Sequence, residues 1–126
     1  MDKYRVLIAL SALAQETRLD IFRYLVEVGP SGVPAGQIGE RLNVPWATLS
    51  FHLKTLQHAG LLERKRQSRS IIYSANFATM NGVVAYLTEN CCGGQPEACA
   101  LPTWEQSDTN DTAQQTTSKQ KRGNER

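Results

Sequence analysis

Apolar side chains recur at helical spacing along the first part of the chain, with turn-forming residues between the segments. A first helix is predicted over about residues 2–14, with its apolar side formed by Tyr4, Leu7, Ile8 and Leu13. A second helix is predicted over about residues 16–28, where apolar residues stand three and four positions apart: Leu19, Phe22, Leu25 and Val26. Residues 29–30 (Gly-Pro) end this helix, because a proline cannot continue the helical hydrogen-bond ladder.

A third and a fourth helix are predicted close together. Pro34 is suited to open the short third helix, where its missing N–H costs nothing, and Ile38 and Leu42 form the inner side of that helix. Residues 43–44 make the turn, and Pro45 opens the fourth helix. The leucines of the fourth helix recur at i, i+4 and i+7: Leu49, Leu53 and Leu56.

The pattern changes after Gly60, which is suited to end the fourth helix. Two strands are predicted over residues 61–66 and 70–74, because β-branched and aromatic residues there flank a polar, basic turn. A last helix is predicted over about residues 76–90. The fold class is therefore mainly α with a small β-hairpin wing (α+β), a winged helix-turn-helix over residues 1–92.

The last helix is too apolar for a small monomer to bury on one side alone. We therefore expect the first and last helices to form the interface of a homodimer, an arrangement that sets two DNA-reading helices in successive major grooves. The alternative is that the last helix only closes the core of the monomer.

Length and composition set outer limits on the class of protein. The chain of 126 residues and 14.0 kDa suits one domain and a tail. Residues 105–126 are polar and predicted to be disordered. The sequence shows no apolar run near the roughly 20 residues of a membrane span and no secretory signal, so we expect a cytoplasmic protein without a membrane partner.

Positive charge is concentrated in one third of the chain. Residues 41–75 contain one acid, Glu63, and six basic residues, for a local charge of +5: Arg41, Lys54, Arg64, Lys65, Arg66 and Arg69. Such a distribution favours a surface that faces a polyanion, although a solvated charged face is the simpler explanation.

The helix pair and the basic hairpin together predict binding of double-stranded DNA. The first turn of the fourth helix would enter the major groove, and the hairpin would contact phosphates or the neighbouring minor groove. The predicted DNA-contacting residues are Trp46, Thr48, Ser50, His52, Lys54, Arg64, Arg66 and Arg69. Alternatively, Trp46 packs over the third helix, and His52 is a residue on the helix surface that has no role in binding.

Three cysteines lie within nine positions: Cys91, Cys92 and Cys99. Zinc prefers four ligands, and the sequence offers no fourth thiolate nearby. A thiophilic three-coordinate ion fits better, either As(III) or Sb(III), and Cu(I) is conceivable. The predicted effector site is thus a cysteine loop over residues 91–99. The alternative is a redox switch in which two of these thiols form a disulfide.

Four segments of the chain resemble the arsenical-resistance repressor (ArsR/SmtB) family: residues 15–19 (QETRL), 49–53 (LSFHL), 59–62 (AGLL) and 72–73 (IY). The resemblance covers about residues 3–92 and implies a homodimeric winged-helix repressor. It places Ser50 and His52 on the DNA-reading helix and residues 66–69 in the wing. The chain resembles the variant whose arsenite site is a pair of adjacent cysteines after the last helix with a third nearby, since residues 34–40 contain no cysteine.

These observations predict a repressor that leaves its operator DNA when As(III) or Sb(III) binds the three cysteines. The alternative function is a thiol redox-sensing repressor that uses the same cysteines. An enzyme is not expected, because the sequence shows no Gly-rich phosphate loop, no clustered His/Asp pair and no Cys-His arrangement at plausible positions. No catalytic cofactor is expected.

Overall fold

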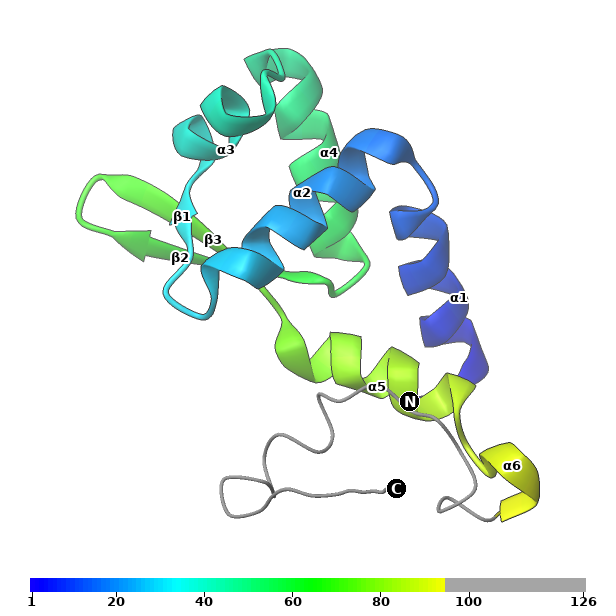
Figure 1. The fold of residues 1–126 in the computed structure, drawn as a ribbon. Coiled ribbons are helices and arrows are strands. Elements are labelled where there is room, and N and C mark those ends of the chain that lie inside the picture. The colour runs from blue at the N-terminus through cyan, green and yellow to red at the C-terminus, as the bar shows by residue number, and fades with distance from the viewer. Residues whose placement is uncertain (95–126) are drawn as a thin grey trace, which may run out of the picture. The chain divides into compact units, whose positions relative to one another are not determined.

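The computed structural model describes residues 1–94, of which residues 1–89 belong to one compact unit. Five helices and three strands make up this unit (Figure 1). The helices are α1 (Lys3–Leu13), α2 (Glu16–Val28), α3 (Ala35–Leu42), α4 (Trp46–His58) and α5 (Phe77–Leu87). The strands are β1 (Val33–Pro34), β2 (Leu62–Gln67) and β3 (Ser70–Ala75). This architecture confirms the predicted class, mainly α with a hairpin wing.

The core lies where α2, α3 and α4 meet the base of the sheet. Its fully buried large side chains come from these helices and the start of the wing: Ile21, Leu25, Ile38, Leu49, Leu53, Leu56 and Leu61. Burying each such side chain stabilises the fold by roughly 1.5–3 kcal/mol relative to leaving it in water. The core therefore fixes α4 against α2 and α3.

The side of α1 that packs on the core is not the predicted apolar side. Small residues at helical spacing face the core, namely Val6, Ala9 and Ala12. Tyr4, Leu7 and Ile8, which belong to the predicted apolar side, are exposed. Short side chains let α1 approach α2 and α4 closely, and the larger apolar residues are left on the outer face.

The sheet has a third strand that the sequence did not reveal. Its order is β1-β3-β2, and both pairings are antiparallel. Strand β1 is two residues long and pairs Val33 with Tyr73 and Pro34 with Ile72. A proline in so short an edge strand leaves almost no periodic signal. This pairing attaches the residues just before α3 to the wing.

Helix α5 is shorter than the predicted range of residues 76–90. Asn76 caps its start by accepting a hydrogen bond from the Thr79 N–H at 3.1 Å, and the helix ends at Leu87. Within α5 the buried residue is Val83, and Leu87 is exposed. A second unit begins at residue 90 and contains the four-residue α6 (Cys91–Gly94). In the described part of the chain, no helix is long and apolar enough to span a membrane.

Candidate nucleic-acid interface

Helices α3 and α4 are joined by a compact turn. Asn43 ends α3 in the left-handed conformation at φ 57°, which asparagine tolerates better than most residues. The Val44 N–H then donates to the Gly39 carbonyl at 3.0 Å. A Cβ on Gly39 would come within 3.1 Å of the Val44 carbonyl oxygen, so the glycine allows the turn to close tightly. The turn sets the angle at which α4 leaves α3.

Helix α4 has one buried stripe and one exposed face. Its buried residues are Leu49, His52, Leu53 and Leu56, at the i, i+3, i+4 and i+7 positions of a single helical side. Ala47, Phe51 and Lys54 lie on the opposite side and are exposed. The buried stripe anchors the helix, so its outer face is held in a fixed orientation.

Helix α4 exposes two large aromatic side chains. Trp46 and Phe51 are each 63% exposed, although residues of this size are usually buried. Trp46 also borders a groove with Gly39 and Glu40 of α3, so the alternative in which it packs over α3 stays open. Thr48 is exposed and Ser50 is half-buried; at 100° per residue they lie on opposite edges of the outer face. Phe51 was not among the predicted contacts, though its position opposite the buried leucines could have indicated it.

The start of α4 offers backbone donors. Pro45 occupies the N-cap position, and the structure records no side-chain cap there among the described residues. The first N–H groups of the helix therefore have no protein side chain as acceptor. Such groups bind phosphate oxygens well, because they combine unpaired donors with the positive end of the helix dipole.

The β2–β3 hairpin forms the wing and projects beyond the helices (Figure 1). Leu62 at its base is buried, whereas residues 63–70 are all exposed. Arg64 and Arg66 point to one face of β2 and Lys65 to the other, because side chains alternate along a strand. Arg69 lies in the two-residue turn. The predicted wing residues are thus all available to a polyanion.

His52 is the predicted contact that the structure places elsewhere. Its side chain is only 8% exposed, and its Nδ1 lies 3.3 Å from Nη1 of Arg18 on α2. Arginine can only donate, so Nδ1 accepts and the proton of the neutral ring is on Nε2. Burial, with a further contribution from the Arg18 charge, lowers the pKa of His52. The expectation of an outward-facing DNA contact is therefore corrected, because position 52 belongs to the buried stripe.

Two of the three predicted effector cysteines lie in the described chain. Cys91 is half-buried and Cys92 is exposed, and Cys92 has the left-handed values φ 54° and ψ 39°. Cys99 and the predicted tail over residues 105–126 lie outside the described residues. Within residues 1–94, no three His, Cys, Asp or Glu side chains are grouped so as to hold a metal ion.

Together, α3, the turn, α4 and the basic hairpin define a winged helix-turn-helix protein. Residues 13–65 match the sequence model of a helix-turn-helix domain. The chain therefore contains a helix-turn-helix domain.

Known proteins that are similar to the chain are transcriptional regulators. An uncharacterized HTH-type transcriptional regulator, YceK of Bacillus subtilis, is 41% identical over 59 residues, which are 47% of this chain and 58% of that protein. The chain thus matches little more than half the length of this relative. That the similar proteins are regulators agrees with the expectation that this chain is not an enzyme.

Solved structures show the same fold. An ArsR-like transcriptional regulator from Rhodococcus sp. RHA1 superposes with a TM-score of 0.60 at 27% identity, covering 84% of this chain and 88% of that one. The homodimeric winged helix-turn-helix domain of Mb0332 from Mycobacterium bovis, a possible ArsR-family regulator, gives a TM-score of 0.56 at 22% identity, covering 70% and 82%. The winged-helix fold of this chain is thus similar to that of these regulators.

Proposed function

We propose that this protein is a transcriptional repressor that binds operator DNA as a homodimer and is released when a thiophilic metalloid ion binds its cysteines. The observation that carries the DNA-binding part is the combination of an exposed outer face on α4 with a basic, exposed wing. Exposed Trp46, Thr48 and Lys54 and half-buried Ser50 would meet bases and phosphates in the major groove. The arginines of the wing would contact the flanking backbone.

The homodimer is supported by the outer faces of two contacting helices. Helix α1 exposes Tyr4, Leu7 and Ile8, and α5, which contacts α1, exposes Leu87. Exposed apolar groups of this kind on one side of a small domain are typical of a protein–protein interface. The homodimeric state of the structurally similar Mb0332 supports the same assembly.

The effector part of the proposal rests on cysteine chemistry. Cys91, Cys92 and Cys99 would supply three thiolates to As(III) or Sb(III), whose lone pair occupies the fourth direction. Cys92 is exposed, and the two residues that follow it, Gly93 and Gly94, have no side chains that could hinder access to its thiol. Both glycines have positive φ values. Binding would release protons and would need to favour the conformation with low DNA affinity.

Fluorescence anisotropy with duplexes from the DNA upstream of the gene tests the DNA-binding part. We expect affinity to fall steeply with salt, with a log–log slope near −0.9 per phosphate neutralised. Arg66→Ala in the wing should reduce that slope by about 1 and weaken all sequences alike. Arg23→Ala changes an exposed arginine on α2 that is not among the proposed DNA contacts; it is the matched control and should keep the wild-type slope. A slope independent of salt would contradict DNA binding by this surface.

Titration of the protein–DNA complex with As(III) tests the effector part. A coupling of about 1–3 kcal/mol would lower DNA affinity 5- to 150-fold. Cys92→Ser should abolish this loss and leave affinity without As(III) unchanged. Release by peroxide in a metal-free buffer, reversed by dithiothreitol and unaffected by As(III), would replace the metalloid with thiol oxidation as the signal.

A further inference from the structure

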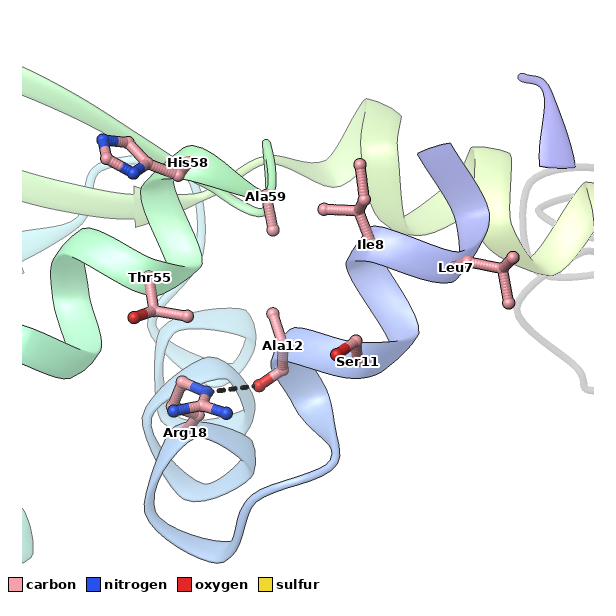
Figure 2. Close-up of a pocket in the computed structure, with 8 residues that line it drawn as sticks. All are labelled: Leu7, Ile8, Ser11, Ala12, Arg18, Thr55, His58 and Ala59. Atoms are coloured by element: carbon pink, nitrogen blue, oxygen red, sulfur yellow. Dashed lines mark hydrogen bonds between the residues drawn. The ribbon is translucent and has the colours of Figure 1, made fainter. Parts of the chain in front are cut away.

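A cavity of about 440 Å³ lies between α1 and the C-terminal half of α4 (Figure 2). This volume is within the range of small-molecule sites in proteins. Apolar groups of Ile8, Ala12, Ala59 and the Thr55 methyl border it, and Ser11 lies at its α1 edge (Figure 2). The cavity is remote in sequence from the three cysteines, and nothing in the proposed DNA contacts uses it. Leu7 and Ile8 also belong to the α1 face of the proposed homodimer, so the cavity adjoins that interface.

Arg18 supplies the charged end of this cavity. Its Nε–H donates to the Ala12 carbonyl at 2.6 Å, and its Nη1 lies 3.3 Å from Nδ1 of His52. These contacts use two of the five N–H donors of a guanidinium. Over residues 1–94, the structure records no carboxylate paired with Arg18, so a half-buried positive charge meets the cavity without a protein counter-ion.

The residues that line the cavity and its neighbour carry no negative charge in the described part of the chain. A neighbouring cavity of about 250 Å³ shares Ile8, His58 and Ala59 with it and adds Arg5. Among the described residues that line the two cavities, there are two arginines and one histidine but no Asp or Glu. An anion would be favoured here, and a cation disfavoured.

We propose that the α1–α4 cavity binds a small amphipathic acid, with its anionic head paired to Arg18 and its apolar body against Ile8, Ala12 and Ala59. A carboxylate and a guanidinium form charge-assisted, often bidentate hydrogen bonds, and these are stronger in a partly buried site than in water. The apolar walls add binding free energy in proportion to the ligand surface that they remove from water.

Occupancy of this cavity would reach α4 through one contact. Arg18 contacts His52, which belongs to the buried stripe opposite the DNA-facing side chains. A carboxylate that draws the guanidinium toward the cavity would weaken this contact between α2 and α4. A change in DNA affinity on ligand binding rests on the proposed function. Ligand binding itself does not, because it is measured in the absence of DNA.

Isothermal titration calorimetry of the full chain with octanoate, and with octanol as the uncharged match, tests the site. We expect octanoate to bind at least tenfold more tightly than octanol. Arg18→Gln should remove this difference, and Arg23→Gln, which makes the same change at an exposed position of α2, should retain it. Equal binding of octanoate and octanol by the wild-type protein, or no octanoate binding at millimolar concentration, would overturn the proposal.

A second variant and a spectroscopic readout separate binding from folding defects. Ser11→Phe places a large side chain at the edge of the cavity from an exposed position, so we expect it to fold and to bind octanoate at least tenfold more weakly. The chain has two histidines, of which His58 lines the cavity and His52 contacts Arg18. Octanoate should therefore shift both imidazole NMR signals. Unchanged imidazole signals, or a Ser11→Phe variant that is folded and binds octanoate normally, would place the ligand elsewhere.

Discussion

At the scale of single residues, the Arg18–His52 pair shows how a titratable group becomes part of a core. The His52 ring is buried, and its Nδ1 faces a guanidinium that can only donate. Such a histidine is held in its neutral form, because protonation would place a second positive charge beside Arg18 with little water to screen it.

This arrangement gives stability a defined pH dependence. Because burial and then Arg18 lower the pKa of His52 below 6.5, the folded chain binds fewer protons than the unfolded chain in the interval between the two pKa values. The contribution of His52 is complete above about pH 6.5 and is lost as the pH falls toward the lowered value. Urea unfolding followed by circular dichroism between pH 5 and 7.5 should therefore show stability that falls with acid.

Two variants identify the residue responsible for this slope. His52→Gln should flatten the decline, because no proton then binds at that position on unfolding. His58→Gln changes the exposed histidine at the end of the same helix and should keep the wild-type decline. A His52→Gln protein with an unaltered pH slope would contradict the assignment.

At the scale of the element, α4 separates stability from recognition by its two faces. Leu53 is 1% exposed and Phe51 is 63% exposed, although they stand two positions apart. The buried face contributes to the free energy of folding, and the outer face is free to contribute to the free energy of DNA binding.

An alanine substitution on the buried face should therefore lower stability, and one on the outer face should weaken DNA binding. Leu53→Ala should lower the free energy of unfolding by about 2–5 kcal/mol, because it leaves a cavity in the core. Phe51→Ala should change stability by no more than about 0.5 kcal/mol and weaken DNA binding about tenfold, through loss of apolar contact with the groove. Urea unfolding and anisotropy on the same preparations give both values. Loss of stability in Phe51→Ala comparable to that in Leu53→Ala would show that this aromatic is structural.

At the scale of the whole molecule, the proposed homodimer would form through the outer side of α1. Tyr4, Leu7 and Ile8 remain exposed because Val6, Ala9 and Ala12 already make the contacts with the core. Two copies that bury these faces against one another would place their α4 helices in a fixed relation, as recognition of a two-fold operator requires.

A charge on this surface should dissociate the dimer and leave the fold intact. Tyr4→Glu introduces a carboxylate at a residue that is 71% exposed, so the monomer has no reason to unfold. Analytical ultracentrifugation should show a monomer, and the salt slope of DNA binding should fall to about half. Leu19→Glu alters an exposed apolar residue on α2, outside α1 and α5, and should stay dimeric. Equal dissociation by both variants, or by neither, would contradict an α1-based interface.

Several features of this protein follow from its sequence alone. Helical periodicity, the prolines at positions 30, 34 and 45, and the glycine at position 60 set the order and approximate limits of α1 to α4 and the wing, because caps and breakers act locally. The exposure of Arg64, Arg66 and Arg69 also follows, since charged residues are rarely buried without a partner. The winged helix-turn-helix class could thus be predicted from local chemistry and charge.

The tertiary structure decided which side of each helix is buried and which distant residues meet. Apolar residues recur at the same spacing whether they pack on the core or lie on the surface. The outward position of Tyr4, Leu7 and Ile8 therefore depended on the small residues that bring α1 close to α2 and α4. The pairing of Arg18 with His52, 34 positions apart, and of β1 with β3 has no local signature, because it depends on how the helices dock. The cavity beside Arg18 exists only in that docked arrangement, since its walls come from α1, α2 and α4.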